Sequence, residues 1–288
     1  MVVKIGYLVS YDYEYLKYSL PLIYENKKVQ EIILVIDKDR LTWSGNRFEI
    51  PHAFFEWIKS FDTESKIKIK EDTFYNELNP PMINENKERN FLYNKMGRCD
   101  WYIQLDCDEY FLDFSSFMNE LEEIYLDKNK YHNTLSVCVK FANLFKKIEK
   151  GFLIISPIIE NCWVATTNPI CYYGRVNESN EIIESDTILV HQSWARNESE
   201  ILQKITNWGH KNDFDSNSYF NLWKSLDRNN YRYIHNFHPL QDNDGVWNEL
   251  KLLHFENIET LLDYSENKLR RIFNKSRLKS TKNNYSKL

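Results

Sequence analysis

The sequence has no run of about 18 apolar residues, and it therefore predicts no membrane-spanning helix. It also shows no signal-peptide pattern, because Met1–Lys4 leads directly into an expected strand. The five cysteines are odd in number and match neither a zinc-binding nor a disulfide pattern, which indicates a reducing environment. From these absences we expect a cytoplasmic protein.

Positive charge is not in excess either. The 37 lysine and arginine residues are outnumbered by 42 aspartate and glutamate residues, and the net charge of −5 predicts no nucleic-acid partner. What the chain does contain is 42% hydrophobic and 15% aromatic residues, a composition typical of a folded globular protein. At 288 residues it is long enough to bury a sizeable core as one domain, with or without an appendage.

The stretch around which the chain is organised runs from Asp100 to Phe111, where a short apolar strand ends in acidic residues. Trp101–Leu105 has the aromatic and apolar character of a buried strand. In extended backbone, Asp106 and Asp108 lie on the same side, about 6.5–7 Å apart along the strand. Such close carboxylates repel each other unless a cation lies between them, and Mg²⁺ and Mn²⁺ prefer oxygen ligands. Because open α/β sheets bind ligands beyond the carboxyl ends of their strands, the pattern favours a metal site here.

The alternative is that these acids only begin a loop or cap the helix expected over 115–126. That helix already has Asp113 and Ser115 as cap candidates, so the acidic residues are not needed there. Because the two carboxylates of Asp106 and Asp108 repel each other, replacing either with asparagine is expected to leave stability unchanged or slightly raised.

The first part of the chain alternates between strand and helix patterns. Val2–Ser10 and Glu31–Asp37 are nearly continuous apolar runs, typical of strands covered on both faces, and an amphipathic helix is expected over 13–26. This spacing predicts a right-handed βαβ unit with parallel strands, and hence an α/β fold. Further strands are expected at 66–70, 135–143 and 187–190, and helices at 52–61, 88–96 and 197–208.

Glu88-Arg89-Asn90, a helix ending at Gly97 and the acidic strand end Asp106–Glu109 together resemble the core of family-2-like glycosyltransferases of the GT-A fold. In that family an Arg-Asn pair opens the helix before the strand that carries the Asp-x-Asp motif. The resemblance covers about the first 115 residues well and the remainder loosely. It implies a Rossmann-like, mostly parallel central sheet flanked by helices, with a C-terminal helical extension.

The same resemblance implies how the chain is divided. A glycosyltransferase domain is expected over 1–215, with a nucleotide-binding half over about 1–115 and an acceptor half over about 116–215. The helical extension is expected over 216–288 and ends in a basic tail.

The resemblance also implies a nucleotide-sugar site at the strand ends. Asp37 would contact the base or ribose, and Arg89 the pyrophosphate, whose oxygens suit a guanidinium fork. The donor-binding residues implied in this way are Ser10, Tyr11, Asp37, Arg89, Asn90, Trp194 and Arg196. The alternatives are a strand-end turn residue for Asp37 and an exposed helical arginine for Arg89. As a strand-end residue, Asp37 is expected to contribute little to the stability of the core.

By the same resemblance, His191 is the third metal ligand beside Asp106 and Asp108, for a Mn²⁺ or Mg²⁺ ion. It follows directly after the strand expected at 187–190. The alternative is a structural or solvent-exposed histidine. Lys204 and His210 flank the apolar stripe of the following helix, and we expect them on the surface. The alternative is that they approach the phosphates of the donor.

An inverting glycosyltransferase also needs a carboxylate base near the acceptor hydroxyl. Here the sequence departs from the commonest pattern of the family, because no Glu-Asp pair begins a helix after the Asp-x-Asp motif. Glu178, Asp186 and Glu198 are the candidates for the catalytic base, and the sequence does not choose among them.

Taken together, the sequence predicts a metal-dependent glycosyltransferase. It would move a sugar from a nucleotide-sugar, with UDP as the expected nucleotide, to a hydroxyl of a glycan or glycolipid in surface polysaccharide or lipopolysaccharide synthesis. One alternative is a sugar nucleotidyltransferase, which usually has a Gly-rich basic loop that Ser10–Glu14 lacks. The other is a non-catalytic carbohydrate-binding protein, in which clustered acids at a strand end have no purpose.

The end of the chain is basic. From Lys268 onward, lysine and arginine residues are interleaved with apolar ones, a composition that suits contact with the inner face of an anionic membrane. A solvated tail is the alternative.

Overall fold

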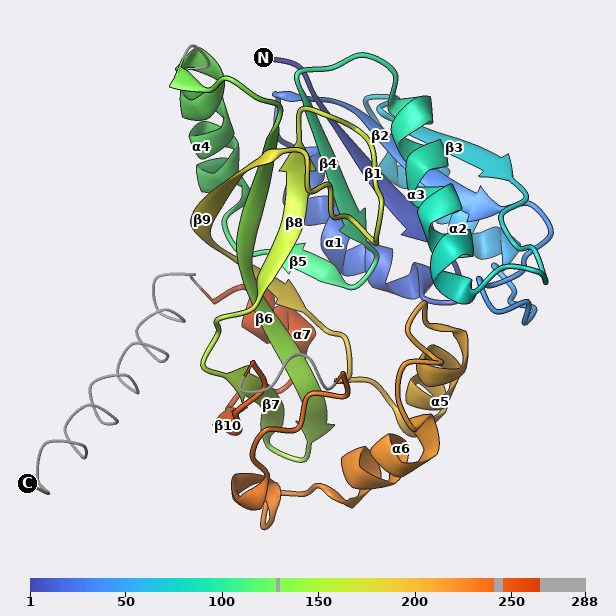
Figure 1. The fold of residues 1–288 in the computed structure, drawn as a ribbon, viewed down its shortest axis with the longest axis vertical. Coiled ribbons are helices and arrows are strands. Elements are labelled where there is room, and N and C mark those ends of the chain that lie inside the picture. The colour runs from blue at the N-terminus through green and yellow to red at the C-terminus, as the bar shows by residue number, and fades with distance from the viewer. Residues whose placement is uncertain (128–129, 241–245, 265–288) are drawn as a thin grey trace, which may run out of the picture.

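The computed structural model describes residues 1–127, 130–240 and 246–264 (Figure 1). Its strands are β1 (Val3–Val9), β2 (Val29–Asp37), β3 (Ile67–Asp72), β4 (Trp101–Asp106), β5 (Glu109–Phe111), β6 (Leu135–Ile148), β7 (Gly151–Ser156), β8 (Asn161–Thr166), β9 (Glu181–His191) and β10 (Glu249–Leu253). They form one mixed sheet in the order β10-β7-β6-β8-β4-β1-β2-β3, while β9 pairs with β5 and β6.

The helices are α1 (Leu16–Tyr24), α2 (His52–Phe61), α3 (Pro81–Met96), α4 (Phe114–Leu126), α5 (Glu198–Asn207), α6 (Ser216–Ser225) and α7 (Ile258–Leu262). Helix α3 begins at Pro81, earlier than expected, because proline is well tolerated in the first turn. The Asp113 carboxylate caps α4 by accepting a hydrogen bond from the backbone N–H of Ser116, as predicted. None of the helices in the described parts of the chain is long and apolar enough to cross a membrane.

The N-terminal half of the sheet is parallel, which confirms the predicted α/β architecture. Strands β3, β2, β1 and β4 run in the same direction, and helices cover both faces (Figure 1). Helices α1, α2 and α4 bury their apolar sides against one face, while α3 packs Leu92 and Met96 against Ile33 and Val35 on the other. Gly6 permits this close approach, since a Cβ at this position would lie 2.3 Å from the Met96 side chain.

The other half of the sheet is mostly antiparallel. Strand β8 pairs antiparallel with β4 and β6, and β7 continues the sheet to β10, while β6 and β9 are parallel. Strand β10 comes from the part of the chain expected as a helical extension, which therefore adds a strand to the sheet as well as α6 and α7. The domain boundary at residue 215 stays a prediction, and the basic tail from residue 268 lies outside the described residues.

Candidate active site

A cavity lies at the carboxyl ends of the parallel strands β1, β2 and β4, which point toward α5 in Figure 1. It is lined by residues that follow these strands, together with side chains from α3 and α5. The predicted site residues among its lining are Ser10, Tyr11, Asp37, Arg89, Asp106, Asp108, His191 and Arg196. The strand-end argument therefore places most of the predicted donor and metal residues around one space.

Strand pairing explains how His191 reaches the acidic strand end. Strand β5 pairs antiparallel with β9 so that Glu109 lies opposite His191, and the N–H of Gln192 donates to the carbonyl of Asp108 over 3.0 Å. Strand β6 runs along the other side of β9 and places Asn143 beside His191. As a result, Nε2 of His191 lies 3.5 Å from Oδ2 of Asp108.

The two aspartates of the motif are each paired with a buried arginine. Asp106 accepts two hydrogen bonds from Arg89, with Nη1 to Oδ1 at 3.1 Å and Nη2 to Oδ2 at 3.3 Å. Arg196 donates to Oδ2 of Asp108, and its Nη2 also lies 3.7 Å from Oδ2 of Asp12. The premise that the two carboxylates repel each other without compensation is therefore wrong, because each already has a cationic partner. We now expect the asparagine variants to be less stable than the natural protein.

These pairs set the charge states in the cavity. Burial alone would raise the pKa of Asp106, but the guanidinium groups of Arg89 and Arg175 hold it at about 2. Burial would likewise raise the pKa of Asp108, and Arg196 holds it well below its ordinary value. Both carboxylates are therefore ionised at neutral pH.

Glu109, the third acid of the cluster, has a structural role. Its buried carboxylate accepts hydrogen bonds from both terminal nitrogens of Arg175 and from the backbone N–H of Asp106. Arg175 also donates to the carbonyl of Gln104 over 2.9 Å. This network fixes the turn between β4 and β5 and hence the direction of the Asp106 and Asp108 side chains.

Lys204 is a further cation in the cavity, besides Arg89 and Arg196. It extends from α5 and is only 8% exposed, so the expectation of a surface lysine is wrong. Among the described residues, none forms a hydrogen bond or ion pair with its Nζ, which lies 5.9 Å from the centre of the Trp208 ring. Burial lowers the pKa of Lys204, which means that its charge is destabilised where it lies.

Asp108 and His191, two of the predicted metal ligands, lie side by side. Nδ1 of His191 lies 2.7 Å from Oδ1 of Asn143, so an Nδ1–H donated to Asn143 leaves the lone pair of Nε2 facing Asp108. In the described parts of the chain, no group of three or more histidine, cysteine, aspartate or glutamate side chains could hold a metal ion. Arg89 engages Asp106 and Arg196 engages Asp108, so either carboxylate would share its oxygens with a guanidinium. Asp108 is the aspartate that faces His191, so these two would be the protein ligands, and substrate phosphates and water would complete the shell, as is common for Mg²⁺.

The carboxylate of Asp37 is occupied by backbone groups. Oδ1 accepts hydrogen bonds from the N–H groups of Asp39 (2.9 Å) and Leu41 (3.0 Å), and Oδ2 accepts one from Phe74 (2.9 Å). Asp37 therefore holds the β2 turn and the start of the loop after β3 together, while one side of it lines the cavity. This arrangement contradicts the expectation that it contributes little to stability.

Replacing Asp37 with alanine is expected to lower the free energy of unfolding by about 2–3 kcal/mol, because three N–H groups lose a charged acceptor. Urea denaturation followed by circular dichroism measures this loss. Asp39→Ala is the control, since Asp39 is exposed and its carboxylate accepts a hydrogen bond from the Thr73 hydroxyl. Equal denaturation midpoints for the natural protein and the Asp37 variant would contradict the role of this carboxylate.

Two predicted donor-binding residues lie outside the cavity lining. Asn90 clamps the loop after β8, because its side-chain amide exchanges two hydrogen bonds of 2.9 Å with the backbone of Cys171. Trp194 is buried in the core around Phe145 and Tyr219. Their side chains position the walls of the site.

None of the three candidate bases lines the cavity. Glu178 is exposed in the loop before β9, at the end of that strand opposite to His191. Asp186 is exposed on β9, five residues before His191 and thus about 16 Å away along the strand. Glu198 begins α5 and forms an ion pair with Lys224.

Three acids of the cavity were not predicted as site residues, namely Asp12, Glu85 and Glu88. Glu88, in the first part of the Glu-Arg-Asn motif, is buried and accepts a hydrogen bond from the indole N–H of Trp43 over 2.5 Å. Burial raises the pKa of Glu88 to about 8, so its carboxyl group is mostly protonated at neutral pH and can donate a hydrogen bond. Glu88 belongs to the Glu-Arg-Asn motif, but the family resemblance assigned donor contacts only to Arg89 and Asn90.

No protein-family model matches the chain. No curated protein matches it either. Among solved structures, residues 1–349 of TarS from S. aureus in complex with UDP-GlcNAc match with 14% identity and a TM-score of 0.34, over 49% of this chain and 35% of that 1–349 chain, about a third of its length. The mannosyltransferase PcManGT from Pyrobaculum calidifontis, in complex with GDP-Man and Mn²⁺, matches with 9% identity and a TM-score of 0.43, over 71% of this chain and 61% of that chain. A CMP:2-keto-3-deoxy-manno-octonic acid synthetase complexed with CTP matches with 9% identity and a TM-score of 0.33, over 72% of this chain and 97% of that chain.

Proposed function

We propose that this protein is a metal-dependent glycosyltransferase with a nucleotide-sugar donor. The observation that supports it best is that one cavity contains both a pair of potential metal ligands and a buried ammonium group. A carboxylate and a histidine nitrogen face each other at Asp108 and His191, and the buried ammonium of Lys204 lies in the same space without an anionic partner among the described residues. A diphosphate with its cation satisfies both features, because it brings negative charge to Lys204 and phosphate oxygens to the metal.

Each part of the donor has residues suited to it. Lys204 would bind a phosphate oxygen, and Arg196 would hold Asp108 in place through their ion pair. Asp108 and His191 would hold a Mn²⁺ or Mg²⁺ ion, and such an ion would neutralise charge on the leaving diphosphate. Ser10, Tyr11 and the protonated Glu88 would contact the nucleoside, for which UDP is the expected form.

The remaining parts of the proposal concern the acceptor and its location. The acceptor would be a hydroxyl of a glycan or glycolipid in surface polysaccharide or lipopolysaccharide synthesis. The enzyme would act in the cytoplasm, with the basic tail in contact with the inner face of the membrane.

A donor screen tests this proposal. The protein is incubated with UDP-, GDP-, CMP- and dTDP-linked sugars, with Mn²⁺ or with excess EDTA, and mass spectrometry records the released nucleotide. We expect slow release from one donor class with Mn²⁺ and none in EDTA. Absence of release from every donor, with or without Mn²⁺, would contradict the proposal, and formation of a sugar nucleotide from a nucleoside triphosphate would identify a nucleotidyltransferase instead.

A further inference from the structure

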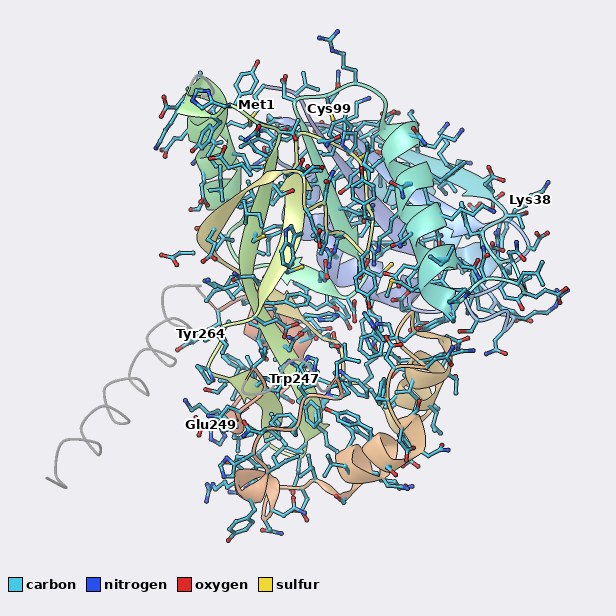
Figure 2. All side chains as sticks on the ribbon, viewed as in Figure 1. Met1, Lys38, Cys99, Trp247, Glu249 and Tyr264 are labelled. Carbon is cyan, nitrogen blue, oxygen red and sulfur yellow. The ribbon has the colours of Figure 1, made fainter. Side chains whose placement is uncertain are left out.

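A second cavity adjoins the first one. The two share His191, Ser193 and Trp208 in their linings, so a molecule in one lies next to a molecule in the other. The second cavity has aromatic walls, which include Phe141, Trp163, Tyr173, Trp208 and Trp247. Figure 2 labels Trp247 in the lower half of the view, where Figure 1 shows β7, β10, α5 and α6.

A chain of hydrogen bonds connects the two cavities. Oε2 of Glu160 accepts from the indole N–H of Trp247 over 2.8 Å and from Nδ2 of Asn143 over 2.7 Å. The amide orientation of Asn143 turns its Oδ1 toward Nδ1 of His191, whose Nε2 faces Asp108. Glu160 thus belongs to the same network as the proposed metal ligands, although it lies in the other cavity.

The backbone of Glu160 is also held in place by a hydrogen bond. Its carbonyl accepts a hydrogen bond from the N–H of Phe141 over 2.9 Å, just before β8 begins. Phe141 in turn stacks on the His191 ring, with 4.4 Å between ring centres. Both donors to the carboxylate approach Oε2, and among the described residues none donates to Oε1, which leaves this oxygen available to a ligand in the cavity.

The walls offer what a sugar ring requires. Aromatic faces pack against the C–H groups of a pyranose, while a few polar groups orient its hydroxyls. Trp163 is one of these wall residues, and its buried indole N–H has no acceptor in the described parts of the chain. Burial also raises the pKa of Glu160, which moves this carboxylate toward the range useful for a base at neutral pH.

We infer that the second cavity binds a pyranose ring of the acceptor and that Glu160 is the catalytic base. This inference rests on the proposed function, because it places the acceptor beside the donor. The acceptor hydroxyl gives its proton to Oε1 of Glu160, and its oxygen forms a bond to the anomeric carbon of the donor. The bond between that carbon and the phosphate oxygen breaks, and its electron pair leaves with the nucleoside diphosphate. In-line attack by an acceptor on the side away from the diphosphate inverts the anomeric configuration.

Replacing Glu160 with glutamine tests the inference. The glutamine oxygen still accepts hydrogen bonds from Trp247 and Asn143, so the wall keeps its structure, but the side chain no longer accepts a proton. Transfer from the donor found in the screen to methyl α- and β-glycosides of glucose, galactose, mannose and N-acetylglucosamine is measured by mass spectrometry. We expect the turnover number of Glu160→Gln to fall about 100-fold or more, the usual contribution of a general base. Calorimetry should give unchanged dissociation constants for the nucleoside diphosphate and for the nucleotide-sugar.

Glu249→Gln is the control, because Glu249 lies on β10 close to Trp247 in the chain and pairs with Lys251 outside the cavity. Natural transfer rates in Glu160→Gln would overturn the inference. So would transfer to none of the glycosides by a natural protein that binds the nucleotide-sugar. A loss of nucleotide-sugar affinity with unchanged nucleoside diphosphate affinity would assign the cavity to the donor sugar and also overturn it. A natural protein that binds no nucleotide at all would instead refute the proposed function.

Discussion

Replacing Asp108 with asparagine is expected to abolish most sugar transfer and to lower the free energy of unfolding by about 3 kcal/mol. Asp108 is 1% exposed and forms an ion pair with the buried guanidinium of Arg196. The neutral amide leaves that guanidinium with Asp12 as its nearest carboxylate, at 3.7 Å, which compensates it only in part. The same change removes a charged ligand of the proposed metal site, so transfer should fall about 100-fold or more.

Denaturant titration measures the loss of stability, and transfer assays at a temperature where the variant is folded measure the loss of activity. Asp113→Asn is the matched control, because asparagine caps a helix about as well as aspartate and both properties should stay near their natural values. A variant at position 108 with natural stability would show that the ion pair contributes nothing, and natural transfer would exclude Asp108 from the site.

Replacing Lys204 with methionine is expected to have opposite effects on stability and binding. The methionine fills a similar volume without a buried charge, so the free energy of unfolding should rise by about 1 kcal/mol. The affinity for a nucleoside diphosphate should fall about 30-fold, equivalent to about 2 kcal/mol, since a charged hydrogen bond to phosphate is lost. A residue that lowers the stability of the unliganded protein but raises its affinity for the nucleotide is one that serves binding and not folding.

Thermal denaturation and calorimetry on the same preparation measure both effects. Lys59→Met on α2 is the control, because Lys59 is exposed and remote from the cavity lining. If Lys204→Met loses stability and keeps its nucleotide affinity, the lysine is part of the core and has no role in phosphate binding.

The sequence was most informative where chemistry follows a regular element. The apolar runs of β1, β2 and β4 predicted parallel strands, and the rule that ligands bind at their carboxyl ends placed Asp106 and Asp108 at the cavity. His191 was proposed from the family resemblance, and its position directly after an expected strand supported that choice. Residues that directly follow a strand can be predicted because the end of a strand depends on the local sequence.

The sequence was least informative about pairing between distant residues. It gave no sign that Arg89 and Arg196 neutralise the two aspartates, since these partners come from α3 and the loop before α5. The candidate bases were chosen by residue type alone. Because β9 runs from Glu181 to His191, Glu178 lies at the end of the strand that is remote from the cavity. Glu160 stands alone between β7 and β8, and only the folded sheet brings it next to Asn143.

Isothermal titration calorimetry of the natural protein with UDP, GDP and CDP tests the central claim most directly. Each nucleotide is titrated in Mn²⁺, in Mg²⁺ and in excess EDTA, and the titration is repeated with His191→Gln. We expect one nucleoside diphosphate to bind in the presence of a divalent cation, with at least tenfold weaker binding in EDTA and in the His191 variant. Binding of the same strength in EDTA would contradict the metal site at Asp108 and His191, and no binding of any nucleotide under any condition would contradict the nucleotide-sugar enzyme as a whole.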